Sequence, residues 1–252
     1  MNHRPKKSLG QHFLSDKNMI TKIISSFELL EGEKLLEIGP GRGALTHELL
    51  KYDCDLTSLE LDTALAKYWQ DIAKERENFT CIEANAVKID WSVFLPVDKL
   101  IGNIPYNVSR SLLYKVFKHR KGIKTVVFMV QKEFADKLIA KPGDSAYGIL
   151  AVLAQTFAKA ELLFTIPPSV FFPPPKVMSA SIKLDLVDLE IDDELFIKVV
   201  QTAFNQRRKT LKNSLKHYYS PDLEDKIDWG KRADQLKPEN YVELVRKLLV
   251  IS

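Results

Sequence analysis

Short apolar runs alternate with amphipathic segments through the first two thirds of the chain. Five runs have the length and apolar content of buried parallel strands: Lys34–Ile38, Leu56–Glu60, Phe79–Ala84, Lys99–Gly102 and Thr125–Val130. Three segments between them have helical spacing: Thr46–Tyr52, Thr63–Arg76 and Ser109–Arg120. Repeated strand–helix–strand units predict an α/β fold with a doubly wound, mostly parallel sheet and right-handed crossovers.

The pattern changes in the last third of the chain. One more helix, Ala146–Ala158, precedes two strands, Glu161–Ile166 and Ser179–Leu186, with no helix between them. Because a proline-rich loop joins these two strands, they can run antiparallel at the sheet edge, which gives seven strands. Beyond them only helix and loop patterns occur. We therefore predict an α/β domain over residues 1–187 and a small all-helical domain over residues 188–252.

Composition excludes several classes of protein. The chain has 252 residues, 45% of them hydrophobic, which is too apolar for a disordered protein. The longest apolar run, around Thr125–Val130, is too short to cross a bilayer, and the basic N-terminus lacks the apolar stretch of a secretory signal. Cys54 and Cys81 form no metal-binding pattern. We expect a cytoplasmic protein without a metal, and a monomer.

Positive charge is concentrated in two segments. The net charge is only +4, but the segment from Lys198 to Ser220 has no acidic residue. The candidate RNA-contacting residues in these segments are Lys6, Lys7, Arg207, Arg208, Lys209, Lys212 and Lys216. Intervals of four residues would place three of them on one helix face. Such a face indicates either a polyanion partner or a solvated helix surface.

A glycine-rich turn lies between the first predicted strand and the next helix. The stretch Leu35–Gly43 reads LLEIGPGRG, and Gly39 and Gly41 permit a close approach of the backbone to a ligand. About twenty residues later, Glu60 ends the next strand, where a carboxylate can accept hydrogen bonds from both ribose hydroxyls. These features favour a nucleoside cofactor. A dinucleotide-binding domain and a purely structural turn are the alternatives.

The sequence Asn103-Ile104-Pro105-Tyr106 follows the fourth strand, at the same sheet edge. An adenine amino group is a poor nucleophile, because its lone pair is delocalised into the ring. The Asn103 amide oxygen and the Ile104 carbonyl could accept its two N–H groups and localise that lone pair. Pro105 makes the turn rigid, and Tyr106 could stack on the base. This combination suits methylation of an amino group and offers nothing for hydride transfer.

Eight motifs in order along the chain point to one family: Lys7–Leu14, Leu36–Thr46, Leu59–Asp62, Gly102–Asn107, Gln131–Glu133, Ala146–Gly148, Pro167–Ala180 and Ala203–Leu211. Together they closely resemble the adenine dimethyltransferases of small-subunit (16S) ribosomal RNA. The resemblance implies a Rossmann-like class I methyltransferase that uses S-adenosylmethionine. It also implies methylation of two adjacent adenines, each twice, in the 3′-terminal hairpin loop of that RNA, with the small ribosomal subunit as partner.

The resemblance further implies the residues of the cofactor site. Gln11, His12 and Leu14 would line the pocket for methionine and adenosine, Gly39 would approach the cofactor, and Asn85 would face its adenine. Asn103 would contact the cofactor as well as the target base. The family often has Asn in place of His12 and usually has Asp in place of Asn85. The Asn85 oxygen can still accept from the adenine amine without charge, so we expect weakened recognition and a lower affinity in Asn85→Ala.

For the target base, the resemblance implies that Asn103 and Tyr106 hold the adenine while Phe171 stacks on its other face. Of the neighbouring pair Phe171 and Phe172, we expect Phe172 to be in the core. Two alternatives remain. One is an antibiotic-resistance methyltransferase of large-subunit ribosomal RNA, and the other is a non-catalytic assembly or transcription factor with the same fold. The intact loop at Asn103 argues against the second.

Overall fold

The computed structural model describes residues 3–220, 223 and 227–251. The chain divides into two compact units. The first comprises residues 1–135 and 161–186, and the second comprises residues 136–160 and 187–252. The longer segment of the second unit begins at Val187, one residue before the predicted start of the helical domain at residue 188. The unit also includes residues 136–160, which the sequence analysis had assigned to the α/β domain.

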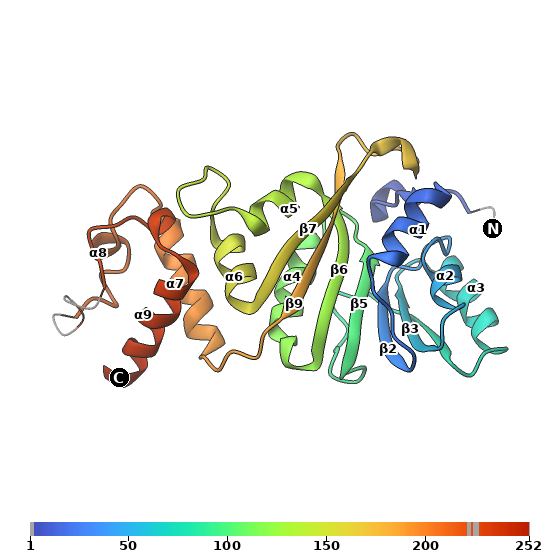
Figure 1. The fold of residues 1–252 in the computed structure, drawn as a ribbon, viewed down its shortest axis with the longest axis horizontal. Coiled ribbons are helices and arrows are strands. Elements are labelled where there is room, and N and C mark those ends of the chain that lie inside the picture. Colours follow the sequence, from blue (N-terminus) through green and yellow to red (C-terminus); the bar gives the residue numbers. More distant parts are fainter. Residues whose placement is uncertain (1–2, 221–222, 224–226, 252) are drawn as a thin grey trace. The chain divides into compact units, whose positions relative to one another are not determined.

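A seven-stranded sheet forms the framework of the first unit (Figure 1). Its strands, in spatial order, are β4 (Phe79–Glu83), β3 (Cys54–Glu60), β2 (Glu33–Ile38), β5 (Val97–Asn103), β6 (Ile123–Gln131), β9 (Ser179–Leu186) and β7 (Ala158–Ile166). The pairs from β4 to β6 are parallel, and β9 pairs with β6 antiparallel. The predicted seven-stranded, mostly parallel sheet is therefore confirmed.

Three helices lie where the apolar spacing predicts them: α2 (Thr46–Leu49), α3 (Thr63–Ala73) and α4 (Ser109–Lys118). Two more, α1 (Lys17–Ser25) and α5 (Lys132–Ile139), were not predicted. Side chains cap two of them: Asp16 accepts from the Met19 N–H, and Asp62 accepts from the Ala64 N–H. Each cap satisfies a backbone donor that the first turn of the helix leaves unpaired. Asp16 and Asp62 therefore mark the beginnings of α1 and α3.

Two very short strands form a second sheet that the sequence analysis did not predict. Strand β1 (Phe13–Leu14) pairs antiparallel with β8 (Phe171–Phe172), so that Phe13 lies opposite Phe172 and Leu14 opposite Phe171. The Ser15 N–H also donates to the Val170 carbonyl at 2.9 Å. The pairing joins the N-terminal segment to the proline-rich loop.

The second unit is a helical cluster. Its helices are α6 (Ile149–Phe157), α7 (Asp193–Asn205), α8 (Leu211–Ser214) and α9 (Pro238–Ile251). Phe157 and Phe196 pack edge to face at 5.3 Å between ring centroids. The buried hydroxyl of Tyr147 donates to the Leu236 carbonyl at 2.7 Å. Tyr147 is anchored within this cluster, which accounts for the grouping of residues 136–160 with the C-terminal helices.

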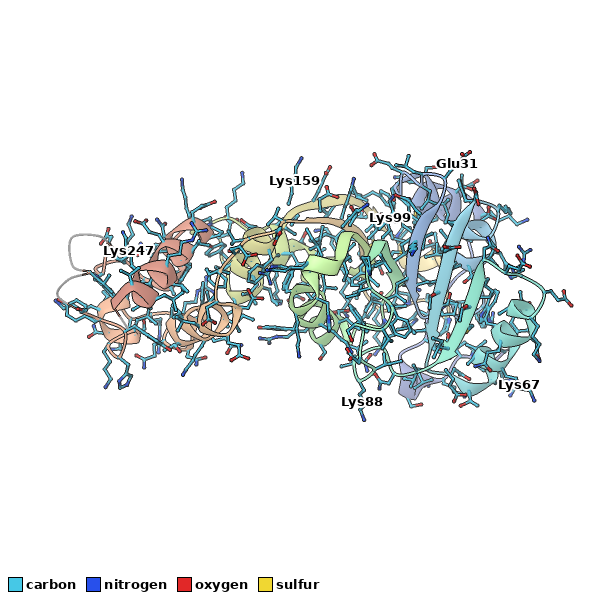
Figure 2. All side chains as sticks on the ribbon, turned by 90° about the horizontal axis from the view of Figure 1, so that it is seen from below. Glu31, Lys67, Lys88, Lys99, Lys159 and Lys247 are labelled. Atoms are coloured by element: carbon cyan, nitrogen blue, oxygen red, sulfur yellow. The ribbon has the colours of Figure 1, made fainter. Side chains whose placement is uncertain are left out.

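Most charged side chains of the first unit are exposed, and Lys99 is one of the few that are buried. Lys67 and Lys88 extend away from the ribbon (Figure 2). Lys99 is buried in β5 and forms an ion pair with Glu33 of β2. A buried ammonium without such a partner would carry a large desolvation cost. This pair therefore belongs to the sheet and not to a binding surface.

Candidate active site

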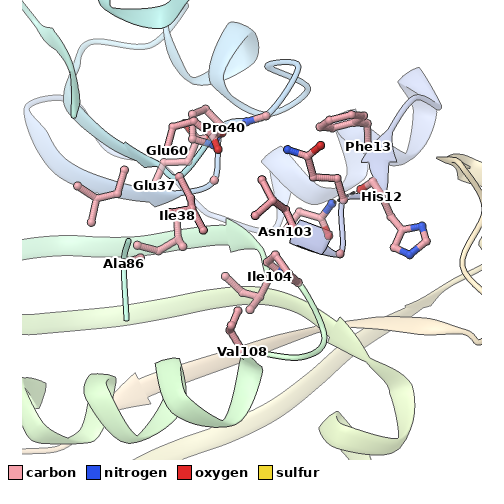
Figure 3. A pocket seen from close by; sticks show the side chains of 18 of the residues that line it. His12, Phe13, Glu37, Ile38, Pro40, Glu60, Ala86, Asn103, Ile104 and Val108 are labelled. Carbon is pink, nitrogen blue, oxygen red and sulfur yellow. Dashed lines mark hydrogen bonds between the residues drawn. The ribbon is translucent and has the colours of Figure 1, made fainter. Parts of the chain in front are cut away.

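A pocket lies at the carboxyl ends of the parallel strands (Figure 3). The N-terminal segment, the glycine turn and the ends of β3, β4 and β5 line it. The predicted site residues on its wall are Gln11, His12, Leu14, Gly39, Gly41, Glu60, Asn85, Asn103, Ile104, Pro105 and Tyr106. The structure therefore brings together residues from five separate parts of the sequence.

The glycine turn presents bare backbone to this pocket. Gly39 has φ +71°, and a Cβ added to it would meet no protein atom within 4 Å, so this side is open. The Gly41 N–H donates to Glu60 Oε2 at 2.9 Å, and the Trp69 indole donates to the Gly41 carbonyl at 2.9 Å. The support from Trp69, which lies on α3, was not predicted. Together these contacts hold the turn in a shape that leaves Gly39 free to approach a ligand.

Glu60 ends β3 with its carboxylate facing the pocket. Its Oε1 accepts from the Asp62 N–H at 2.9 Å, in addition to the bond from Gly41. Burial raises the pKa of Glu60, and the backbone hydrogen bonds partly offset that effect. Each carboxylate oxygen keeps a second lone pair, so Glu60 can still accept ribose hydroxyls.

Asp62 fastens the N-terminal segment beside the pocket, a role that the sequence analysis missed. It lies 3.0 Å from both the Lys6 ammonium and the His3 ring, and it accepts from the Gln11 amide at 3.3 Å. Burial alone would raise the pKa of Asp62, but the hydrogen bonds from Lys6 and Gln11 and the charge of His3 lower it. Lys6, predicted to contact RNA, is thus engaged by Asp62 in this structure.

Asn103 is held by a backbone group of the N-terminal segment. Its Nδ2 donates to the His12 carbonyl at 2.8 Å. The next residue, Ile104, donates its N–H to the Met129 carbonyl at 3.0 Å, which ties the loop to β6. Because Nδ2 donates to the His12 carbonyl, the side-chain oxygen of Asn103 is the atom that can accept a hydrogen bond from a ligand. This is the orientation that amino-group methylation needs.

The ring of Tyr106 is positioned from two sides. Its hydroxyl lies 2.7 Å from the Ser179 hydroxyl, and its ring stacks on that of His12 at 5.9 Å with an interplanar angle of 24°. His12 in turn shares a 2.7 Å hydrogen bond between Nδ1 and the Pro173 carbonyl. Neither Ser179 nor the stacking role of His12 was predicted, because both depend on strand pairing distant in sequence.

The structure corrects the assignment of the two phenylalanines. Phe171 is 4% exposed, packs in the core of the first unit, and does not line the pocket. Phe172 is 52% exposed, and its ring lies 5.2 Å from the Arg42 guanidinium. The expectation that Phe172 is the core residue is wrong. The pairing with β1 explains the difference. Phe171 lies opposite Leu14, and both pack in the core. Because successive residues of a strand point to opposite faces, Phe172 points away from that core.

Glu37 is a buried acid on the pocket wall that the predicted site did not include. It is 1% exposed and accepts hydrogen bonds from the hydroxyls of Ser58 at 2.7 Å and Thr46 at 3.0 Å. Burial raises its pKa to about 7, although these two hydroxyls lower it. A buried acid with a pKa near 7 makes the stability of the folded site depend on pH in the neutral range.

The basic segment is not one continuous helix, contrary to the expectation from its spacing. Helix α7 ends at Asn205, and α8 contains only Lys212 of the predicted RNA-contacting residues. Thr210 instead forms a β-bridge with Arg232, which interrupts the helix. Arg207 pairs with Asp234 at 3.1 Å. The remaining basic side chains predicted to contact RNA are exposed: Lys7, Arg208, Lys209, Lys212 and Lys216.

Within the described ranges, no cluster of three or more His, Cys, Asp or Glu side chains is arranged to hold a metal ion. The helices of that part of the chain also include none that is long and apolar enough to span a bilayer.

Comparison with known proteins decides the family. A family model described as ribosomal RNA adenine dimethylase matches residues 2–249. The chain belongs to this family. It is therefore an S-adenosylmethionine-dependent ribosomal RNA adenine dimethyltransferase, as the resemblance of its motifs implied.

Individual relatives agree with this assignment. The "Ribosomal RNA small subunit methyltransferase A" of Parabacteroides distasonis is 42% identical over 247 residues, which covers 96% of this chain and 92% of the relative. The protein of that name from Alcanivorax borkumensis is 40% identical, covering 96% of this chain and 89% of the relative. The crystal structure of a dimethyladenosine transferase from Plasmodium falciparum matches with a TM-score of 0.84 and 26% identity, covering 95% and 98% of the two chains. This structural match supports the α/β methyltransferase fold.

Proposed function

We propose that this dimethyltransferase modifies N6 of two adjacent adenines in the 3′-terminal hairpin loop of small-subunit ribosomal RNA, transferring two methyl groups to each. The observation that carries the chemistry is the hydrogen bond of 2.8 Å from Asn103 Nδ2 to the His12 carbonyl. It leaves the amide oxygen as the acceptor for the target amine. The names of the small-subunit relatives support the choice of RNA.

The residues of the pocket fit S-adenosylmethionine. Gly39 offers an open backbone face, and Glu60 offers acceptor lone pairs for ribose hydroxyls. Gln11, His12 and Leu14 close the wall formed by the N-terminal segment. The cofactor, when bound, supplies an electrophilic methyl group on a sulfonium. The protein's part is to align this methyl group with the target nitrogen at Asn103.

The proposed transfer needs acceptors and alignment more than a strong base. Asn103 Oδ1 and the Ile104 carbonyl accept the two N–H groups of the adenine amine, which localises its lone pair. Bound S-adenosylmethionine would supply the methyl group, and its sulfur would keep the electrons of the broken carbon–sulfur bond. The methylated nitrogen would then be positively charged and acidic, and its extra proton would leave to water. Fixed dipoles near the developing charge lower the barrier.

Tyr106 and His12 are the pair of rings proposed to hold the target base, in place of Tyr106 and Phe171. Their centroids are 5.9 Å apart, whereas a base between two rings needs about 7 Å, or two contacts of roughly 3.5 Å. The two rings therefore have to separate by about 1 Å to admit the base. Stacking on aromatic rings contributes about 1–3 kcal/mol per base, which offsets part of the cost of unstacking it.

Exposed basic residues are proposed to contact the RNA backbone, namely Lys7, Arg208, Lys209, Lys212 and Lys216. Such contacts position RNA without reading its sequence. Arg207 is better explained as a structural residue, because its guanidinium also donates to the Ser145 carbonyl at 3.1 Å. A cytoplasmic location and a monomeric state remain predictions.

The direct test is to incubate the protein with labelled S-adenosylmethionine and either unmethylated small ribosomal subunits or large subunits. Labelled nucleosides are then mapped by mass spectrometry. We expect dimethyladenosine at two adjacent positions near the 3′ end of the small-subunit RNA and no label in the large subunit. Label confined to large-subunit RNA would instead support the resistance-type alternative.

A further inference from the structure

The side chain of Asn85 has only one polar end available to a ligand. Asn85 follows β4 and lines the pocket. Its Oδ1 accepts from the Val87 N–H at 2.9 Å, and its own carbonyl accepts from Lys88 and Ile89, both at 2.9 Å. These bonds fix the turn and hold the side-chain oxygen of Asn85 against the backbone N–H of Val87. Among the residues that the structure describes, none accepts a hydrogen bond from Asn85 Nδ2.

The strand order places Asn85 where the base of the cofactor has to lie. The sheet runs β4-β3-β2-β5, with Glu60 at the end of β3 and Asn103 at the end of β5. With the ribose at Glu60 and the reactive methyl group toward Asn103, the base extends the opposite way, across the end of β4. Ala86 and Val87 supply apolar wall there. The edge of adenine farthest from its ribose carries N1, an acceptor, and the N6 amine, a donor.

From this arrangement we propose that Asn85 is a specificity-determining residue that donates from Nδ2 to the adenine N1 and does not accept from the N6 amine. The inference rests on the proposed mode of cofactor binding. It differs from the sequence-based expectation, in which the Asn85 oxygen accepts from that amine. An aspartate at this position keeps the bond from Val87 but presents a carboxylate oxygen in place of Nδ2. Asn85→Asp should therefore reverse the preference from N1 to the N6 amine.

Two base-modified analogues of S-adenosylhomocysteine separate these modes by calorimetric binding, independently of RNA and catalysis. One lacks the 6-amino group, and the other has carbon in place of N1. For the wild type we expect removal of N1 to weaken binding about 10-fold, the typical effect of one hydrogen bond, and removal of the amine to change it less than about 3-fold. For Asn85→Asp we expect the opposite ranking.

Asn240→Asp is the matched control. Asn240 Oδ1 also accepts a backbone N–H, that of Lys237 at 3.0 Å, but Asn240 is exposed and does not line the pocket. This variant should bind all three ligands as the wild type does. The proposal is overturned if the wild type loses about 10-fold in affinity when the 6-amino group is removed, or if neither analogue distinguishes the wild type from Asn85→Asp. Parent S-adenosylhomocysteine is measured with every variant, and its failure to bind the wild type would overturn the cofactor assignment and not only the role of Asn85.

Discussion

The hydroxyl of Tyr106 lies 2.7 Å from the hydroxyl of Ser179, although 73 residues separate them. Tyr106 belongs to the loop after β5, and Ser179 is the first residue of β9, where it is 1% exposed. This contact joins the loop after β5 to the antiparallel strand and restricts rotation of the ring. The orientation of the proposed base platform thus depends on a strand that lies outside the parallel part of the sheet.

A double-mutant cycle tests this contact. Ser179→Ala and Tyr106→Phe should each lower kcat/KM by about 3- to 10-fold, the effect of one lost hydrogen bond. The double variant should be no worse than either single variant, because both remove the same bond. Ser181→Ala is the control: Ser181 is buried on the same strand, and its hydroxyl has no partner in the described part of the chain. Additive losses would contradict the coupling.

The stacking role of His12 predicts a dependence on aromatic character at that position. His12→Ala should lower kcat/KM for RNA by about 10-fold, because one face of the base loses its platform. His12→Phe should remain within about 3-fold of the wild type, since stacking is retained. The backbone carbonyl that holds Asn103 is present in both variants. Phe172→Ala is the control and should have little effect, because the ring is exposed and lies outside the pocket. A larger loss of kcat/KM in Phe172→Ala than in His12→Ala would assign the stacking role to the proline-rich loop instead.

Buried Glu37 predicts a pH dependence of stability. Its pKa is raised from 4.5 in the unfolded chain to about 7, so the folded state retains a proton that the unfolded state loses. Its contribution is therefore fully favourable below pH 4.5 and is lost as pH rises to 7. Glu37→Gln should become more stable relative to the wild type by up to about 3 kcal/mol across this window. Denaturant unfolding at pH 5 and pH 8 measures this difference, and parallel pH profiles would contradict it.

The exposed basic residues predict a salt effect. Lys209→Gln should weaken binding to all RNA sequences similarly and lower the slope of log affinity against log salt by about 1, as for one lost phosphate contact. Lys67→Gln, an exposed lysine on α3, is the control and should leave the slope unchanged. Filter binding over a range of salt concentrations measures both. An unchanged slope in Lys209→Gln would favour the solvated-surface interpretation.

The sequence was most informative where structure follows from local patterns. Apolar runs predicted the parallel strands, and the glycine turn, Glu60 and Asn103 were predicted to meet because parallel strands end at one sheet edge. The pairing of Phe13–Leu14 with Phe171–Phe172 was missed, because two-residue strands are too short to show a periodicity. That same pairing decides which phenylalanine is buried.

The basic segment shows a second limit of local patterns. Its four-residue spacing is compatible with a helix, but the backbone at Thr210 pairs with Arg232. The N–H of Leu211 likewise donates to the Lys231 carbonyl at 2.8 Å. Such contacts between distant segments override helix propensity and leave no signal in the spacing of charges.

The Asn103→Ala variant tests whether the side chain of Asn103 accepts the target amine. Methylation of unmethylated small ribosomal subunits is measured by mass spectrometry of their nucleosides, with binding of S-adenosylhomocysteine and of the subunit measured on the same preparation. We expect both monomethyl- and dimethyladenosine to fall by at least about 100-fold, in line with removal of a group that acts in the transition state, while both binding affinities stay within a few-fold of the wild type. Dimethyladenosine formed at a near-normal rate would contradict the role of Asn103 as acceptor for the target amine.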